Sequence, residues 1–184
     1  MRNRFVYKAI VFLAGLVFLG LGLSGAQAKR VIAPSCVSPQ MQKPIPPEVE
    51  PFACERLSIR IKGGDDHFFN VELAVTDHQQ EYGLMNRTRL PEDYGMLFVF
   101  PEAGRRIFWM KDTLVPLDML FISADGTINH IHPDAKPRDL TSIRSETPSM
   151  AVLELKGGGA KRQNIQVGDQ VVYKAFAPQS FHAP

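Results

Sequence analysis

The amino-acid sequence predicts a mainly β protein, a small β-barrel or sandwich of about eight short strands with one helix near residues 76–86. Several short segments alternate apolar and polar residues, as half-buried strands do, and turn-forming Gly and Asp residues separate them. Only one segment carries a strong helix-start signal. The 184 residues are 45% hydrophobic and 22% charged, which is typical of a globular protein and excludes collagen, coiled coil and full-length disorder.

Two alternating segments, Leu57–Lys62 and Phe69–Val75, are predicted to form the first hairpin. The residues between them, Gly63-Gly64-Asp65-Asp66, have the composition of a tight turn. A second hairpin is expected from Leu117–Ser123 and Thr127–His132. Further strands are predicted at Met96–Phe100, whose continuous apolar run indicates burial on both faces, and at Ile107–Met110, Ala151–Lys156 and Gln170–Phe176.

The predicted helix begins at Thr76. Thr76 and Gln79 have the spacing of a capping box, and Asp77 suits the positive N-terminal end of a helix. Gly83 lies inside the predicted helix, where it costs about 1 kcal/mol relative to Ala, so we expect close packing against a strand there. One further helical turn is predicted at Ala160–Asn164.

Residues 1–28 have the features of a secretory signal peptide. A positive start (Arg2, Arg4 and Lys8) precedes the apolar stretch Ala9–Gly25, and Ala26-Gln27-Ala28 has the small-x-small form of a cleavage site. We therefore expect export to the periplasm or the extracellular space, with an uncleaved membrane anchor as the alternative.

Cleavage would remove three of the 21 basic residues and none of the 19 acidic ones, leaving 18 against 19. A charge near zero argues against nucleic-acid partners, and we expect membrane contact only through an uncleaved signal. A Pro-rich leader is predicted at residues 29–51, one β-rich domain at 52–176 and a flexible tail at 177–184. Cys36 and Cys54 are expected to pair, because exported proteins retain disulfides, and such a loop would contribute about 3 kcal/mol.

The segment from Phe108 to Asp118 is the main candidate site. It holds the chain's only Trp, Trp109, followed by Lys111 and by Asp118 inside an apolar run. With Glu81 and Arg87 from the preceding segment, these residues could form a charged cluster beside an aromatic wall, as in sites for small polar ligands. The structural alternative is that Asp118 pins the turn at Pro116 through backbone amides.

Four consecutive blocks of this chain resemble the domain of unknown function 192 family: Gly83-Leu84-Met85-Asn86-Arg87, Gly95-Met96-Leu97-Phe98-Val99-Phe100, Phe108-Trp109-Met110-Lys111-Asp112-Thr113 and Pro116-Leu117-Asp118. The resemblance extends from about Leu57 to Phe176. It implies a compact, mostly β domain that is often exported in Gram-negative bacteria, and it implies no activity. The family usually has Lys-Asn-Thr where this chain has Lys-Asp-Thr. The polar positions shared with the family are Glu81, Arg87, Lys111, Thr113, Asp118 and Glu154.

Two alternatives to a ligand-binding or accessory module stay open. The chain has no standard catalytic motif, but a hydrolase-type enzyme could use Asp118 or Glu154 as the acid or base. A metal-handling protein could use His130 and His132, which are two apart on one strand face, with Met110, Met119 or Met150 as soft ligands. No cofactor is expected.

Overall fold

The two predicted hairpins are present in the computed structural model, which describes residues 41–176. The predicted signal peptide, Cys36 and the tail at 177–184 lie outside the described residues, so the pairing of Cys36 with Cys54 stays a prediction. None of the helices in the described part is long and apolar enough to cross a membrane. The elements are, in chain order, β1 (Ala53–Arg60), β2 (Asp66–Ala74), α1 (Asp77–Tyr82), β3 (Tyr94–Gly104), β4 (Ile107–Phe108), β5 (Leu117–Ile122), β6 (Ile128–Ala135), β7 (Ile143–Arg144), β8 (Ser149–Lys156), α2 (Gly159–Arg162) and β9 (Gln170–Val172).

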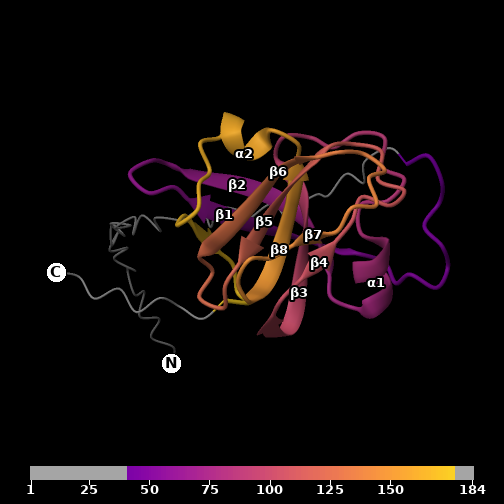
Figure 1. Cartoon of the computed structure of the whole chain (residues 1–184), viewed down its shortest axis with the longest axis horizontal. Helices are drawn as coiled ribbons and strands as arrows, with labels where there is room; N and C mark the ends of the chain where they lie inside the picture. Colours follow the sequence, from indigo (N-terminus) through magenta and orange to yellow (C-terminus); the bar gives the residue numbers. More distant parts are fainter. Residues whose placement is uncertain (1–40, 177–184) are drawn as a thin grey trace, which may run out of the picture. The chain divides into compact units, whose positions relative to one another are not determined.

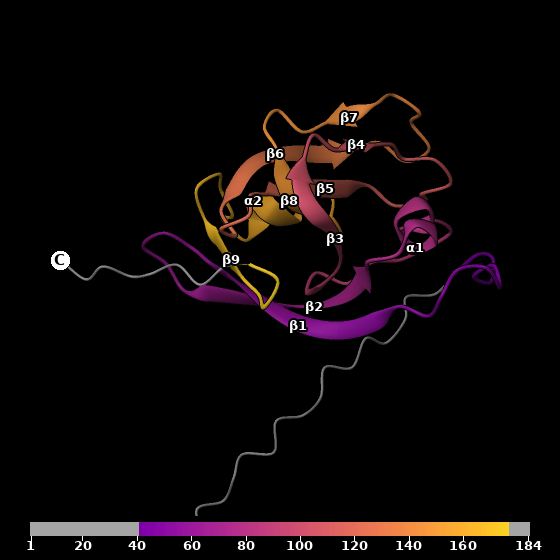
Figure 2. The ribbon, with the colours of Figure 1, turned by 90° about the horizontal axis from the view of Figure 1, so that it is seen from below.

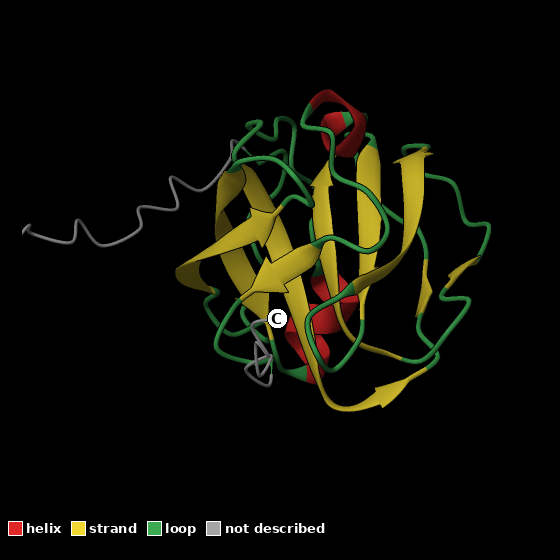
Figure 3. Ribbon diagram, turned by 90° about the vertical axis from the view of Figure 1, so that its left-hand side faces the viewer, coloured by secondary structure: helices red, strands yellow, loops and turns green. Residues whose placement is uncertain are grey.

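Seven strands form one sheet in the order β6-β5-β8-β3-β2-β1-β9, and β4 and β7 form a separate two-stranded ribbon (Figures 1 and 3). The neighbours are antiparallel except β2 and β3, which run parallel and are connected through α1. The mainly β architecture predicted from the sequence is therefore confirmed, with nine strands and two short helices in the described residues.

The sheet curls so that β1 and β2 lie across an apolar core from β5 and β8 (Figure 2). Leu57 and Val71 from the first pair of strands and Leu120 and Leu153 from the second belong to this core and are at most 2% exposed. Alternation on β1 and β2 thus directs one face inward, as the sequence predicts.

A second core covers the other face of the central strands. Met96 and Phe98 on β3 alternate with Leu97, which faces the first core. Ribbon residue Phe108 packs edge-on against Phe98, with 5.1 Å between ring centroids, and against Phe121 at 6.2 Å. The central strands are buried on both faces because the ribbon and its flanking loops lie over this face.

Helix α1 has the predicted capping box but is shorter than predicted. The Thr76 hydroxyl accepts a hydrogen bond from the Gln79 amide, and the Gln79 side chain accepts one from the Thr76 amide. The helix ends at Tyr82 because Gly83 adopts φ +51°, which the helix cannot continue. The expected close packing is present, since a Cβ on Gly83 would lie 3.2 Å from Cζ of Phe98.

The described part of the predicted leader, residues 41–51, contacts α1 and the loop that follows it. The Thr76 hydroxyl donates to Glu50 Oε2 at 2.7 Å, and Gln79 Nε2 donates to the Pro51 carbonyl at 3.1 Å. The Gln42 amide donates to the Asn86 carbonyl at 2.7 Å. These bonds hold residues 41–51 beside the candidate site.

Candidate functional site

Asp118 is fully buried and is held by backbone amides. Its Oδ1 accepts the amides of Asp134 and Gly158, both at 2.9 Å, and its Oδ2 accepts the amide of Ala160 at 2.8 Å. No Lys or Arg within residues 41–176 forms an ion pair with it. Asp118 therefore ties β5 to β6 and to the start of α2, which is close to the structural alternative considered from the sequence.

Arg87 is also in the interior, away from Trp109. Its Nη2 lies 2.5 Å from Glu72 Oε2, and both side chains are at most 5% exposed. Burial raises the pKa of Glu72, although the charge of Arg87 works in the opposite direction. Arg87 Nε and Nη1 have no hydrogen-bond partner among residues 41–176, and the guanidinium lies 5.9 Å from the centre of the Phe52 ring. We conclude that Arg87 and Glu72 form a buried ion pair.

Glu72 was not identified from the sequence. It alternates with Val71 and Leu73 on β2, so the pattern places it on a polar, solvent-facing side of the strand. The structure covers that side with the loop carrying Arg87. In the sequence, Glu72 is visible only as a carboxylate inside a strand. Its partner, Arg87, is 15 residues further along the chain, in the loop that follows α1.

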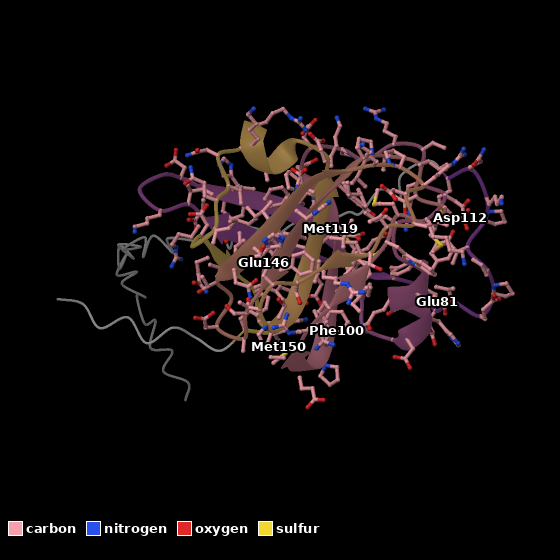
Figure 4. The ribbon with its side chains drawn as sticks, viewed as in Figure 1. Glu81, Phe100, Asp112, Met119, Glu146 and Met150 are labelled. Carbon is pink, nitrogen blue, oxygen red and sulfur yellow. The ribbon has the colours of Figure 1, made fainter. Side chains whose placement is uncertain are left out.

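Trp109, Lys111 and Glu81 do come together. Trp109 follows β4 with 48% of its surface exposed, and the Lys111 ammonium lies 5.3 Å from the indole centroid. Glu81 lies on the exposed side of α1 (Figure 4), and it lines one hollow together with Phe100 and Trp109. Three of the five candidate ligand-binding residues therefore share one surface, whereas Arg87 and Asp118 lie elsewhere.

A groove of about 490 Å³ lies between α1 and the β4 ribbon. Phe100, Phe108 and Trp109 supply its aromatic surface, and Glu81 and Arg105 supply charges. The lining is completed by Gln80, Phe98, Arg106 and Ile107.

Arg106 is already engaged within the protein. Its guanidinium lies 3.8 Å from the Phe100 ring centroid, its Nε donates to the Ser149 carbonyl at 3.2 Å, and its Nη2 donates to the Glu102 carbonyl. Partial burial lowers the pKa of Arg106. These contacts fix one side of the groove and leave Arg106 little freedom to bind another group.

A smaller hollow of about 180 Å³ adjoins the groove at Glu81, which lines both. Leader residue Val49, the buried Tyr82 and Lys111 are among its other lining residues. The Tyr82 hydroxyl is buried and has no hydrogen-bond partner in the described part of the chain. Glu81 thus connects two hollows on one surface, and Lys111 lines the smaller of them.

Glu154 is the one candidate acid or base with a strongly perturbed pKa. It is 4% exposed on β8, flanked in register by Met96 and Met119, and burial raises its pKa to about 8. Its side chain makes no hydrogen bond or ion pair with another residue in 41–176. The enzymatic alternative, with Asp118 or Glu154 as the acid or base, stays a prediction.

His130 and His132 lie on the same face of β6, opposite Phe121 and Met119. Burial, assisted by the charge of His130, lowers the pKa of His132. His130 Nδ1 lies 3.7 Å from Glu146 Oε1. No group of three or more His, Cys, Asp or Glu side chains suited to a metal ion occurs in the described part, and the metal-handling alternative stays a prediction.

Comparison with known proteins gives two similar solved structures. A chain from Sinorhizobium meliloti 1021, described as a candidate transcription regulator, is 43% identical, with a TM-score of 0.67 over 68% of this chain and 97% of that one. A protein of unknown function from Novosphingobium aromaticivorans DSM 12444 is 37% identical, with a TM-score of 0.63 over 65% of this chain and 85% of that one. No curated protein shows a significant match. The model of the family DUF192, described as "Uncharacterized ACR", matches residues 58–173, and this chain therefore belongs to that uncharacterised family.

Proposed function

We propose that this protein is an exported module that binds a small polar ligand in the groove beside Trp109. The observation that carries the proposal is the half-exposed Trp109 at a hollow whose remaining lining combines three Phe rings with exposed charges. Ligand sites typically combine apolar and aromatic walls with a few polar groups that fix orientation. The aromatic surface would contact one face of the ligand, and the charged rim would bind its polar groups.

Another surface hollow, beside β9, can be compared with the groove beside Trp109. It measures about 580 Å³ and is lined by Glu55, Tyr173 and Lys174 among others. There Lys174 Nζ lies 2.5 Å from Glu55, and the Tyr173 hydroxyl donates to Glu55 at 2.9 Å. Glu55, Tyr173 and Lys174 therefore already bind one another, and Arg56, which also lines this hollow, lies over the Phe68 ring. Glu81 and Arg105, in contrast, have no side-chain partner in 41–176. The groove beside Trp109 is thus the better candidate for a ligand.

Binding can be tested by the fluorescence of Trp109, the only Trp in the chain. The chain from residue 29 onward would be titrated with small sugars, amino acids and organic acids, and a saturable spectral shift is expected for at least one class. Trp109→Phe with calorimetric detection should weaken binding of that ligand, and Phe68→Leu, at an exposed aromatic on β2, serves as the matched control. If no class binds, the proposal fails.

Export can be tested separately by cell fractionation. The mature protein is expected in the periplasmic or secreted fraction, with its N-terminus at Lys29. Replacing Ala26 and Ala28 with bulky residues should block cleavage and leave the protein at its full-length mass. A cytoplasmic, full-length wild-type protein would contradict the expected export.

A further inference from the structure

Two unpaired charges of opposite sign line the groove beside Trp109. Glu81 is exposed on α1, and Arg105 is exposed just before β4. Neither side chain forms an ion pair or hydrogen bond with another described residue, and the two are not within ion-pair distance of each other. The groove therefore offers one free carboxylate and one free guanidinium from different elements.

The other charged groups near the groove are already in contact with the protein. Arg106 lies on Phe100 and donates to two carbonyls, and Lys111 lies over Trp109 on the side of the adjoining hollow. A ligand that enters the groove therefore meets Glu81 and Arg105 as its available charged partners, with Phe rings between the elements that carry them.

We propose that the ligand is a zwitterion with an apolar or aromatic body, namely a free amino acid or the end of a short peptide. This inference rests on the proposed function and specifies its ligand class. The guanidinium of Arg105 can bind the ligand carboxylate through two parallel N–H donors, and Glu81 can accept from the ligand ammonium. The body of the ligand would contact Phe100, Phe108 and Trp109.

Charge complementarity distinguishes this class from neutral sugars and from simple anions. A ligand that lacks either charge would desolvate Glu81 or Arg105 on binding without replacing the lost water contacts. Sites that hydrogen-bond a substrate group discriminate strongly against analogues lacking it, since the protein group is then left unpaired. Selectivity should therefore depend on both ends of the ligand, and each end should depend on one of these two residues.

The test uses L-phenylalanine and two derivatives that each lack one charge, with the chain from residue 29 onward and Trp109 fluorescence as the signal. N-acetyl-L-phenylalanine has no ammonium group, and L-phenylalaninamide has no carboxylate. We expect each derivative to bind at least about tenfold more weakly than the amino acid. Equal affinities for all three compounds would overturn the inference.

Single substitutions assign each end. Arg105→Gln should remove the preference over the amide and keep the preference over the N-acetyl compound, and Glu81→Gln should do the reverse. Arg56→Gln, at an exposed Arg on β1 that lies over Phe68, should leave both preferences unchanged. All three variants change exposed side chains, and their melting temperatures verify folding.

The outcomes also separate this inference from the proposed function. Binding of a neutral methyl glycoside without binding of L-phenylalanine would overturn the zwitterion and leave the ligand-binding module in place. Binding of neither compound, nor of any other small polar ligand, would overturn both. A preference for L-phenylalanine that neither Arg105→Gln nor Glu81→Gln alters would show that the zwitterion binds elsewhere, which also overturns the assignment.

Discussion

Asp118 Oδ2 accepts the backbone amide of Ala160 at 2.8 Å, across 42 residues of sequence. The other oxygen accepts two more amides, so one carboxylate organises the junction of β5, β6 and α2. These are charge-assisted hydrogen bonds in a fully buried place, which are among the stronger ones in proteins. Asp118 therefore has a role in the fold, and it also lines a hollow of about 310 Å³ at this junction, so ligand binding by Asp118 stays a prediction.

Asp118→Asn should destabilise the protein because an amide has one acceptor oxygen and presents N–H donors where a backbone amide also points. We expect a loss of about 1–3 kcal/mol in the free energy of unfolding, measured by urea denaturation. Asp112→Asn is the matched control, since Asp112 is exposed with φ +52°, a conformation that Asn tolerates. Equal stability of the Asp118→Asn variant and the wild type would show that the three amides contribute little.

Glu72→Gln should be more damaging, because it leaves the Arg87 guanidinium buried without a carboxylate. Removing one partner of a buried ion pair typically costs about 3–5 kcal/mol. The double change Glu72→Leu with Arg87→Met should recover part of that loss, since no charge then remains in the interior. A double variant as unstable as Glu72→Gln would indicate that packing, rather than the unpaired charge, is responsible.

Gly83→Ala should cost more than Gly63→Ala, although both glycines have positive φ angles of 51° and 78°. A Cβ on Gly63 would meet nothing within 4 Å, so that variant reports only the backbone cost of about 1–2 kcal/mol. At Gly83 the new Cβ would also press on Phe98 at 3.2 Å. Gly83 also has ψ −135°, outside the left-handed helical region, which adds backbone cost for Ala. Combining Gly83→Ala with Phe98→Leu should relieve the part of the cost that comes from the contact with Phe98, as a double-mutant cycle would show.

Sequence reasoning succeeded where the signal is local. The Gly-Gly-Asp-Asp turn and the alternation around it predicted the β1–β2 hairpin, and the capping box placed the start of α1. Helix α1 is shorter than predicted because the positive φ angle of Gly83 ends it, and a Gly within a helical pattern does not reveal its φ angle. The parallel pairing of β2 with β3 depends on a tertiary crossover and has no local signature.

The sequence predicts the candidate site only in part, because some of its residues are close in the sequence and others are brought together by the tertiary structure. Trp109 and Lys111 are two residues apart in one exposed segment, and Glu81 reaches them through the fold. Arg87 and Asp118 are polar residues in apolar surroundings, a pattern that buried structural groups and ligand-binding groups share. Which of the two applies depends on Glu72 and on the amides around Gly158, and only the tertiary structure places these partners.

The buried carboxyl of Glu154 should make stability depend on pH. Its pKa in the folded protein is about 8, above the ordinary 4.5. Between these two values the folded state retains a proton that the unfolded state has released. The free energy of unfolding therefore falls as pH rises through this window, and it levels off above about pH 8.

Glu154→Gln replaces the carboxyl with a neutral group of similar shape. The variant should therefore gain stability relative to the wild type between pH 5 and pH 9, by up to a few kcal/mol. Urea denaturation of both proteins across this range measures the difference, in which the contributions of Glu72 and His132 cancel because both proteins contain them.

Glu92→Gln is the control with the opposite sign, because Lys156 and Arg162 lower the pKa of Glu92. The contribution of Glu92 to stability is therefore present above the ordinary pKa and is lost only at lower pH. A constant difference between wild type and Glu154→Gln from pH 5 to pH 9 would mean that Glu154 ionises normally, and the enzymatic alternative would then lose its tuned acid.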